Sequence, residues 1–343
     1  MGGMEDEALV KLSEKASSIT SVILTAGWHS TASQLASVSA IIRTAMRLQD
    51  VKVYSHSPRE NDIWEAIVGS SATLRKIEFG TITPATLKSS ILFPVLTELK
   101  LIVQDHQILT DIFKNTTFPH LTSLTCGSYS AHQAHPDHAS IFINAIVSSC
   151  SHETLTSLSL LANYDDHESW PGEHRAPYIS SEVLRPLLKF KWLHHLHIAP
   201  EWSWNLDDKL VEQMAHAWPG LTHLHLDPNP FWLMDNCLIT FRSLETLARR
   251  CPDLEHFGAI INSTPPPPAS PPGPPLNGHW HGGLLTLCVG DSGVDACGPV
   301  AAYLSGVFPN LQEIRTHNEQ FPTEWQQIHA LGDSGQFDLG HGR

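Results

Sequence analysis

Trp218-Pro219-Gly220-Leu221-Thr222-His223-Leu224-His225-Leu226 is the stretch that decides the fold, because its opening recurs along the chain. The recurring unit is an aromatic residue or cysteine, then proline, any residue and leucine. It leads into the spacing Leu-x-x-Φ-x-Φ, where Φ is mostly aliphatic. The other four copies begin at Phe93, Phe118, Cys251 and Phe308. Because proline cannot continue a helix and holds the preceding residue in extended geometry, each unit is predicted to end a helix and open a strand. Repetition at this scale indicates a solenoid.

Aligning the first leucine-like position of each segment gives eleven candidate strands, spaced on average by about 29 residues, near the long end of the leucine-rich repeat range. They start at Ile19, Leu48, Leu74, Leu96, Leu121, Leu155, Leu193, Leu221, Leu254, Leu284 and Leu311. The segment from Leu221 to Phe231 matches the full repeat consensus, including Asn229, and Asn163 holds the same place after Leu155. The predicted fold class is an α/β leucine-rich repeat solenoid of about 11 irregular repeats. We expect a curved horseshoe with a parallel β-sheet on its concave face and helices on its convex face.

The domain prediction is one solenoid over residues 1–343, with four special segments. Residues 1–18 are predicted to form the N-terminal helix of an incomplete repeat, and 323–331 a closing helix followed by a flexible tail over 332–343. Eight prolines fall in 264–277, which is predicted to be an inserted loop of polyproline or disordered type. Its P-x-x-P spacing is also compatible with a ligand of SH3 or WW domains, although no arginine flanks it.

Helical spacing fills the intervals between the expected strands. Leu35, Val38, Ile42 and Ala45 share one helix face, and Leu244, Leu247 and Cys251 share another. Asp207 and Asp208 precede a third apolar face and are candidate N-cap residues.

Residues between the consensus leucines should point away from the core, because alternate residues of a strand face opposite sides. In the seventh to ninth repeats these positions are histidines, and adjacent parallel strands lie about 4.8 Å apart. The sequence therefore predicts one partner-binding patch on the concave face and rim, with aromatic residues in the loops beside it. Its candidate residues are His195, His197, His223, His225 and His256, with Trp202, Trp204, Phe231 and Trp232. The alternative for the aromatic residues is that they pack locally over the loops.

Histidine clusters raise the question of a metal. Zinc needs three or four converging ligands, and the sequence places no carboxylate or cysteine on the same face, so no metal site and no cofactor are predicted. The histidines at 132, 135 and 138, next to Asp137, are expected to lie in a solvated loop. A pH-dependent interface is the hypothesis favoured for both clusters.

Composition excludes several classes of protein. The net charge is −14, which argues against nucleic acid or an anionic membrane as the partner. The N-terminus is acidic, with no signal peptide and no membrane-length apolar run, so an intracellular chain, cytoplasmic or nuclear, is expected. The six cysteines form no C-x-x-C pair and are expected to be reduced thiols, with Cys251 and Cys288 in the core. No nucleophile, phosphate-loop or metalloprotease motif is present, so no enzyme is predicted, a metal-dependent enzyme being the remote alternative.

Four features of the sequence together resemble a known family. They are the Phe-Pro-x-Leu openings, the irregular repeats, the weakly conforming strand from Leu96 to Leu101 and the closing segment that contains Trp325. The layout is similar to the C-terminal leucine-rich repeat region of F-box proteins, especially those of mushroom-forming fungi. The resemblance covers Ile19 to Leu331 and implies a non-enzymatic protein-binding module, the substrate-recognition part of an F-box-like ubiquitin ligase receptor. An unknown protein substrate is the implied partner. The Leu-Pro-x-Glu opening of an F-box is not seen, so a cullin-ligase adaptor is expected to bind only if an F-box lies upstream. The alternative is a standalone repeat scaffold or inhibitor unrelated to ubiquitin.

Overall fold

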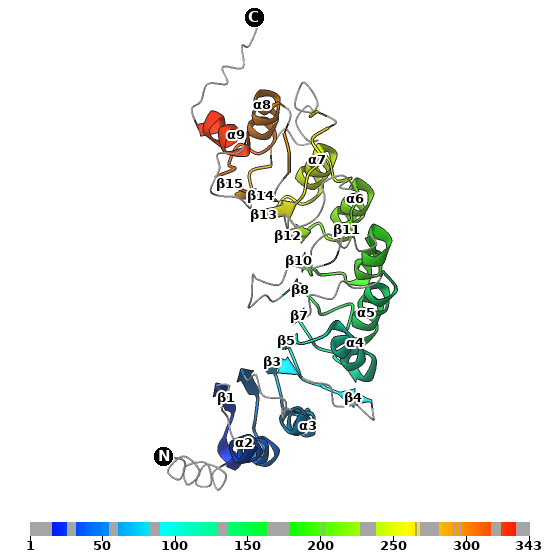
Figure 1. Ribbon diagram of the computed structural model, residues 1–343, viewed down its shortest axis with the longest axis vertical. Helices are drawn as coiled ribbons and strands as arrows, with labels where there is room; N and C mark the ends of the chain where they lie inside the picture. The colour runs from blue at the N-terminus through cyan, green and yellow to red at the C-terminus, as the bar shows by residue number, and fades with distance from the viewer. Residues whose placement is uncertain are drawn as a thin grey trace, which may run out of the picture. The chain divides into compact units, whose positions relative to one another are not determined.

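The computed structural model describes residues 16–25, 32–54, 61–82, 90–128, 136–162, 179–200, 202, 204–226, 238–264, 266–267, 281–290, 292–294, 296–316 and 324–333. The chain forms two compact units. The first comprises Met1–Arg175 and Lys189–Lys191, and the second Ala176–Leu188 and Trp192–Arg343. Within each unit, strands run along one side and helices along the other (Figure 1).

The first unit contains six parallel strands that pair in chain order. They are β1 (Ser21–Thr25), β2 (Asp50–Tyr54), β3 (Lys76–Ile82), β5 (Glu98–Val103), β7 (Ser123–Ser128) and β8 (Ser157–Ala162). The helices beside them are η1 (Ala16–Ser18), α2 (Ala32–Thr44), α3 (Asn61–Gly69), α4 (His106–Asn115) and α5 (Pro136–Ser149). The short strands β4 (Ile91–Leu92) and β6 (Thr116–Thr117) pair with each other.

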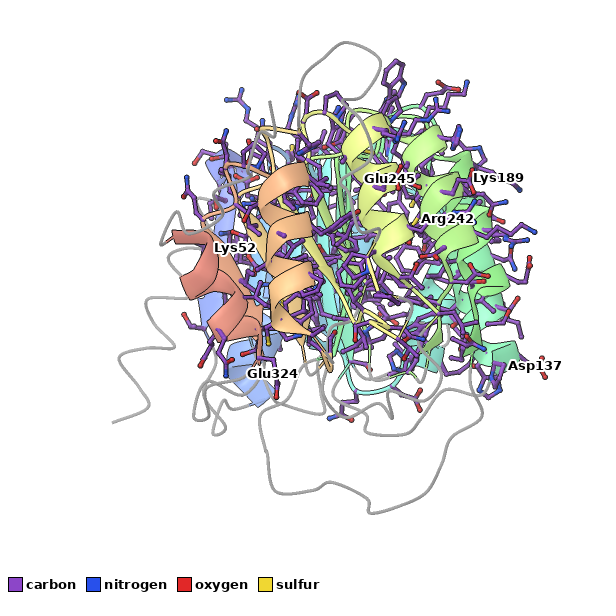
Figure 2. All side chains as sticks on the ribbon, turned by 90° about the horizontal axis from the view of Figure 1, so that it is seen from above. Lys52, Asp137, Lys189, Arg242, Glu245 and Glu324 are labelled. Carbon is purple, nitrogen blue, oxygen red and sulfur yellow. The ribbon has the colours of Figure 1, made fainter. Side chains whose placement is uncertain are left out.

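The second unit repeats the same plan with five parallel strands in chain order. They are β10 (His195–Ala199), β12 (His223–Leu226), β13 (His256–Ala259), β14 (Thr286–Gly290) and β15 (Glu313–Thr316). The helices are η2 (Ser181–Lys189), α6 (Asp208–Ala217), α7 (Phe241–Arg250), α8 (Cys297–Val307) and α9 (Glu324–Asp333), and β9 (Ile179–Ser180) pairs with β11 (Trp204–Asn205). Charged side chains such as Arg242 and Glu245 lie on α7 (Figure 2).

The fold is therefore mixed α/β, with parallel strands in chain order in each unit and helices between them. This confirms the predicted fold class, a leucine-rich repeat solenoid. The consensus leucines form the core: Leu74, Leu96, Leu121, Leu155, Leu221 and Leu284 are all fully buried. Burying an aliphatic side chain of this size contributes about 1.5–3 kcal/mol, so a row of them holds successive repeats together.

Three of the five copies of the aromatic-or-Cys, Pro, x, Leu unit end a helix and form a turn. The copies at Phe93 and Phe118 instead follow the short strands β4 and β6, so the predicted helix end is wrong at those two places. Trp218, Cys251 and Phe308 are the C-caps of α6, α7 and α8, and each donates its backbone N–H to the carbonyl four residues earlier. In each case the carbonyl of the same residue then accepts the N–H of the leucine at the end of the unit, over 3.1 Å. These are the proline-containing turns that the sequence predicts, with the first side chain of the unit buried.

A shared carbonyl joins each repeat to the next. The carbonyl of Arg75 accepts N–H groups from Thr97 and Glu98, over 2.8 and 3.1 Å, and Thr222 serves Glu255 and His256 in the same way. Where threonine follows the first leucine, its hydroxyl donates to that carbonyl as well: Thr97 to Arg75, and Thr222 to His194. This arrangement fixes the register of neighbouring strands through the main chain.

Some of the remaining sequence predictions agree with the structure, and others fall on residues that it does not describe. Val38 and Ile42 are buried on α2, and Ala45 is buried directly after it. Asp207 is the N-cap of α6 with its carboxylate accepting the Leu210 N–H, and α9 covers the expected closing helix. Residues 1–15, the tail beyond Asp333, Asn163, Asn229 and most of the proline-rich segment lie outside the described residues, so those predictions stay untested.

Two predictions need correction. Cys288 is not a core residue, because it lies on the same face of the sheet as Gly258 and Arg315 and is half-buried. Asp137 and His138 do not lie in a loop, because α5 begins at Pro136, a residue suited to the first turn of a helix.

Candidate functional site

The face of the sheet opposite the helices carries the residues between the buried leucines, and we call it the open face. Strand pairing places its members side by side as the sequence predicts: Ser21 with Asp50, Lys76 with Glu98, Ser123 with Ser157, and His195 with His223. Because the repeat sets the register, each repeat adds two residues of its strand to the open face.

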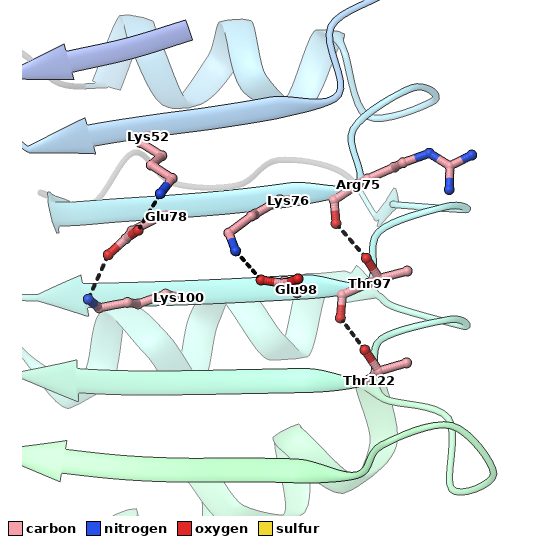
Figure 3. A network of polar contacts seen from close by, with 8 residues as sticks. All are labelled: Lys52, Arg75, Lys76, Glu78, Thr97, Glu98, Lys100 and Thr122. Atoms are coloured by element: carbon pink, nitrogen blue, oxygen red, sulfur yellow. Dashed lines mark hydrogen bonds and ion pairs between the residues drawn. The ribbon is translucent and has the colours of Figure 1, made fainter. Parts of the chain in front are cut away.

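In the first unit the open face is a network of opposite charges (Figure 3). The Glu78 carboxylate lies between two ammonium groups, 3.7 Å from Lys52 Nζ and 2.6 Å from Lys100 Nζ, and Lys76 pairs with Glu98. Partial burial alone would raise the pKa of Glu78, but hydrogen bonds from Lys100 and Tyr54 lower it below its usual value. These charges satisfy one another within the unit.

In the second unit the open face is the histidine patch, which we define as His195, His197, His223, His225 and His256. Parallel pairing aligns His195 with His223 and His223 with His256 in one row, and His197 with His225 in the next. Ring centroids are 4.9 Å apart for His195 and His223, and 4.3 Å for the stacked pair His223 and His256. The His197 and His225 rings meet at 5.1 Å. The structure thus brings together all five histidines that the sequence singled out.

Four imidazoles of the patch, those of His195, His197, His223 and His225, have a lowered pKa and are neutral at neutral pH. Partial burial and neighbouring imidazoles lower the pKa of His195 and His223, and burial lowers that of His197. Burial is greatest at His225, where it and the adjacent rings lower the pKa to about 4. A neutral imidazole offers one N–H donor, one acceptor nitrogen and an aromatic face, so the patch can make hydrogen bonds and stacking contacts without a net charge.

Gly258 is the third member of the second row, beside His225. It is buried, because the His225 imidazole lies over it, and an added Cβ would come within 2.8 Å of that ring. The missing side chain at this position lets His225 lie flat against the next strand.

The aromatic residues proposed for the rim turn out differently. Trp202 and Trp204 are 1% and 8% exposed, and their rings contact each other at a tilt of 51° with centroids 5.5 Å apart. Trp204 also belongs to the short strand β11, which pairs with β9. These two indoles are local core, so the proposal that they contact a partner is wrong. Phe231 and Trp232 lie outside the described residues.

The sequence analysis missed two residues at the edge of the patch, Glu255 and Thr222. Glu255 directly precedes His256, and one ligand atom from each of His223, Glu255 and His256 lies within 4.8 Å of the others. Thr222 contacts His223, with 3.0 Å between Oγ1 and Nδ1, and its hydroxyl also reaches the His194 carbonyl over 2.9 Å. Their position in the sequence, directly before an open-face histidine, could have identified them. The alternation rule does not cover that position, because it lies just before the strand.

His281 is a further histidine that the sequence did not single out, and its part is structural. It occupies the first place of the turn unit before Leu284 and is buried. Its Nε2 donates to the Cys251 carbonyl over 2.7 Å, while its Nδ1 accepts the Leu284 N–H. A buried imidazole here does what phenylalanine or tryptophan does in other repeats.

Comparison with known proteins adds little. No protein-family model matches the sequence, and no curated protein is detectably similar to it. Among solved structures, the leucine-rich repeat-containing protein LegL7 from Legionella pneumophila is similar over 95% of each chain, with 13% identity and a TM-score of 0.36. The fold assignment rests on the strand order, register and buried leucines of this chain itself. Within the described ranges, no helix is long and apolar enough to span a membrane.

Proposed function

We propose that this chain is a non-enzymatic protein-interaction module that binds its partner through the histidine patch. The observation that carries the proposal is the alignment of five half-buried imidazoles from three adjacent strands on the open face. A rigid parallel sheet holds them, so they are already arranged before binding, which lowers the entropy lost on association.

The chemistry of the patch favours a partner segment with carboxylates or backbone carbonyls. Neutral imidazoles donate hydrogen bonds to such acceptors, and protonation adds charge attraction as the pH falls. The charged network of the first unit is a weaker candidate for binding, because Lys52, Glu78 and Lys100 already pair with one another.

The finer proposal is that the module selects substrates for an F-box-like ubiquitin ligase. Its support is the sequence resemblance to the repeat regions of F-box proteins. The alternative is a standalone repeat scaffold or inhibitor unrelated to ubiquitin. The two differ in whether a cullin-ligase adaptor accompanies the partner when the upstream coding sequence is included.

The test is affinity purification with quantitative mass spectrometry, using the wild-type chain and the double variant H195S/H197S. Serine is what β8 carries at the equivalent positions, Ser157 and Ser159, so the change is compatible with this repeat geometry. We expect at least a fivefold loss of a specific partner protein from the variant. The matched control K76Q/E98Q removes an ion pair from the open face of the first unit and should keep the partner.

All samples contain a chelator, so that metal ions make no contribution. A partner that is retained by H195S/H197S and lost from the control would contradict the assignment of the site. Recovery of the partner without any cullin adaptor, from a chain extended upstream, would favour the scaffold alternative.

A further inference from the structure

We infer that His223, Glu255 and His256 form a binding site for a divalent transition-metal ion at the edge of the histidine patch. Two imidazoles and one carboxylate are ligands that Zn²⁺ commonly takes, and imidazole suits zinc, copper and nickel better than magnesium or calcium. The sequence interpretation rejected a metal because no carboxylate was placed on the face. Glu255 supplies that carboxylate.

The three ligands are close enough to converge. One ligand atom from each lies within 4.8 Å of the others, whereas a tetrahedral zinc site separates its donors by about 3.3 Å. The His223 and His256 rings are stacked at 25°, so their in-plane lone pairs run nearly parallel. Rotation of one of these imidazoles, together with the exposed Glu255 side chain, brings the three donors onto one ion. Glu255 forms no ion pair with another described residue, so no existing pair has to break.

The main chain holds the ligands in place. The N–H groups of Glu255 and His256 both donate to the Thr222 carbonyl, over 2.8 and 3.1 Å, and the N–H of His223 donates to the His194 carbonyl. His223 also pairs directly with His256 across β12 and β13. The ligands therefore sit on neighbouring strands with fixed register, which is the rigid support that a metal site needs.

The contact with Thr222 fixes which ring nitrogen of His223 carries the proton and which is free to bind metal. The Thr222 hydroxyl has one proton, which it donates to the His194 carbonyl over 2.9 Å. In the 3.0 Å contact with His223 Nδ1 it must therefore accept, so Nδ1 carries the ring proton. The lone pair is left on Nε2, and an acceptor for the other ring N–H is the usual outer support of a histidine ligand.

The site leaves room in the coordination sphere. Three protein ligands fill part of a four- or five-coordinate ion, and water takes the rest. Because Glu255 is exposed and His223 is only partly buried, an ion can reach the site without opening the fold.

The test is competition for Zn²⁺ with a chromophoric chelator at pH 7.5, on the purified chain without any partner. We expect one tight site, with affinity at least tenfold lower in H223Q, in H256Q and in E255Q. T222V removes the hydroxyl with little change of shape and should cost about tenfold, as loss of an outer partner does. Mg²⁺ in hundredfold excess should not displace the zinc.

Two controls separate this site from zinc binding by other histidines. H197Q removes an imidazole from the patch outside the trio, and D253N removes a nearby exposed carboxylate; both should bind zinc within twofold of wild type. Circular dichroism confirms that each variant is folded. Wild-type-like zinc affinity in E255Q and H256Q would overturn the proposal.

A second readout avoids variants altogether. In long-range ¹H–¹⁵N spectra of the wild-type chain, His223 should carry its proton on Nδ1, and zinc should shift its Nε2 together with a nitrogen of His256. Zinc shifts confined to other histidines would sink the assignment. The assay contains no partner, so its failure would leave the proposed protein-binding function intact.

Discussion

Gly258 shows how a single residue shapes the surface of a repeat protein. It lies directly beside His225 in the register of β12 and β13, and the absence of a Cβ lets the imidazole cover the strand. Strand alternation gives no sign that a neighbouring ring buries Gly258, because that depends on the rotamer of His225 in the preceding repeat.

Gly258→Ala should destabilise the chain by about 1–2 kcal/mol, because the new methyl group would overlap the His225 ring at 2.8 Å and force it out. Chemical denaturation followed by circular dichroism measures the change. In an H225S background the same substitution should cost much less, since the ring is gone.

Gly298→Ala is the matched control, because an added Cβ there meets no atom within 4 Å. An equal cost for Gly258→Ala with and without His225 would show that the overlap is not the cause.

Individual residues also show which parts of the candidate site the sequence predicts and which it does not. Alternation placed the five histidines correctly, because position within a strand decides which face a residue takes. It failed for Trp202 and Trp204, which lie between elements, where no periodicity applies and burial depends on how a loop folds back. Glu255 was missed because it stands just before β13, where the alternation has not begun.

At the scale of elements, neighbouring helices are tied together by a carboxylate near the start of α6. Asp207 caps its own helix, as its sequence position predicts. Asp208 instead reaches the next helix: one oxygen accepts the Thr240 N–H over 2.8 Å and the other accepts the Thr240 hydroxyl over 2.6 Å, with Ser243 as a further donor. Thr240 is the N-cap of α7, so Asp208 steadies the start of that helix.

Asp208→Ala should lower the free energy of unfolding by about 2–3 kcal/mol, because three donors at the start of α7 lose a charged acceptor. Urea denaturation measures this, and Glu212→Ala, an exposed carboxylate on the same helix, should change it by less than about 0.5 kcal/mol. If both variants lose the same free energy of unfolding, the contact between Asp208 and α7 is not what stabilises the chain.

Helix ends were more predictable than helix partners. A buried residue followed by proline marks the ends of α6, α7 and α8, and these helices end where the pattern predicts. The bond from Asp208 to Thr240 spans a whole repeat and depends on how two helices pack, which the spacing of one helix does not contain.

At the scale of the whole molecule, each unit buries an imidazole that stays neutral. Burial lowers the pKa of His106 in the first unit to about 4, and burial with neighbouring imidazoles does the same to His225 in the second. An unfolded histidine takes up a proton below about pH 6.5. The stability that these neutral rings contribute is therefore complete above pH 6.5 and is lost as the pH falls toward 4.

At pH 5, each of these two rings should lower the free energy of unfolding by about 2 kcal/mol relative to pH 7.5. Urea denaturation at the two pH values tests this. H225Q should lose less stability between them than wild type does, whereas H216Q, which removes an exposed imidazole, should follow wild type. A pH dependence unchanged by H225Q would contradict the buried neutral ring.

The sequence predicts the repeated part of the molecule well and the rest poorly. The order of the strands and their register follow from the leucine spacing, because each repeat buries the same positions against its neighbour. The division into two compact units was not predicted.

The shared carbonyls give the array a property that matters over evolutionary time. Register between repeats is fixed by backbone groups of residues such as Arg75, His194 and Thr222, whose side chains differ completely. Open-face residues can then be exchanged, serine for histidine or lysine for threonine, while the strands keep their alignment. A chain of this kind can acquire a new binding surface one repeat at a time while keeping the way in which its repeats stack.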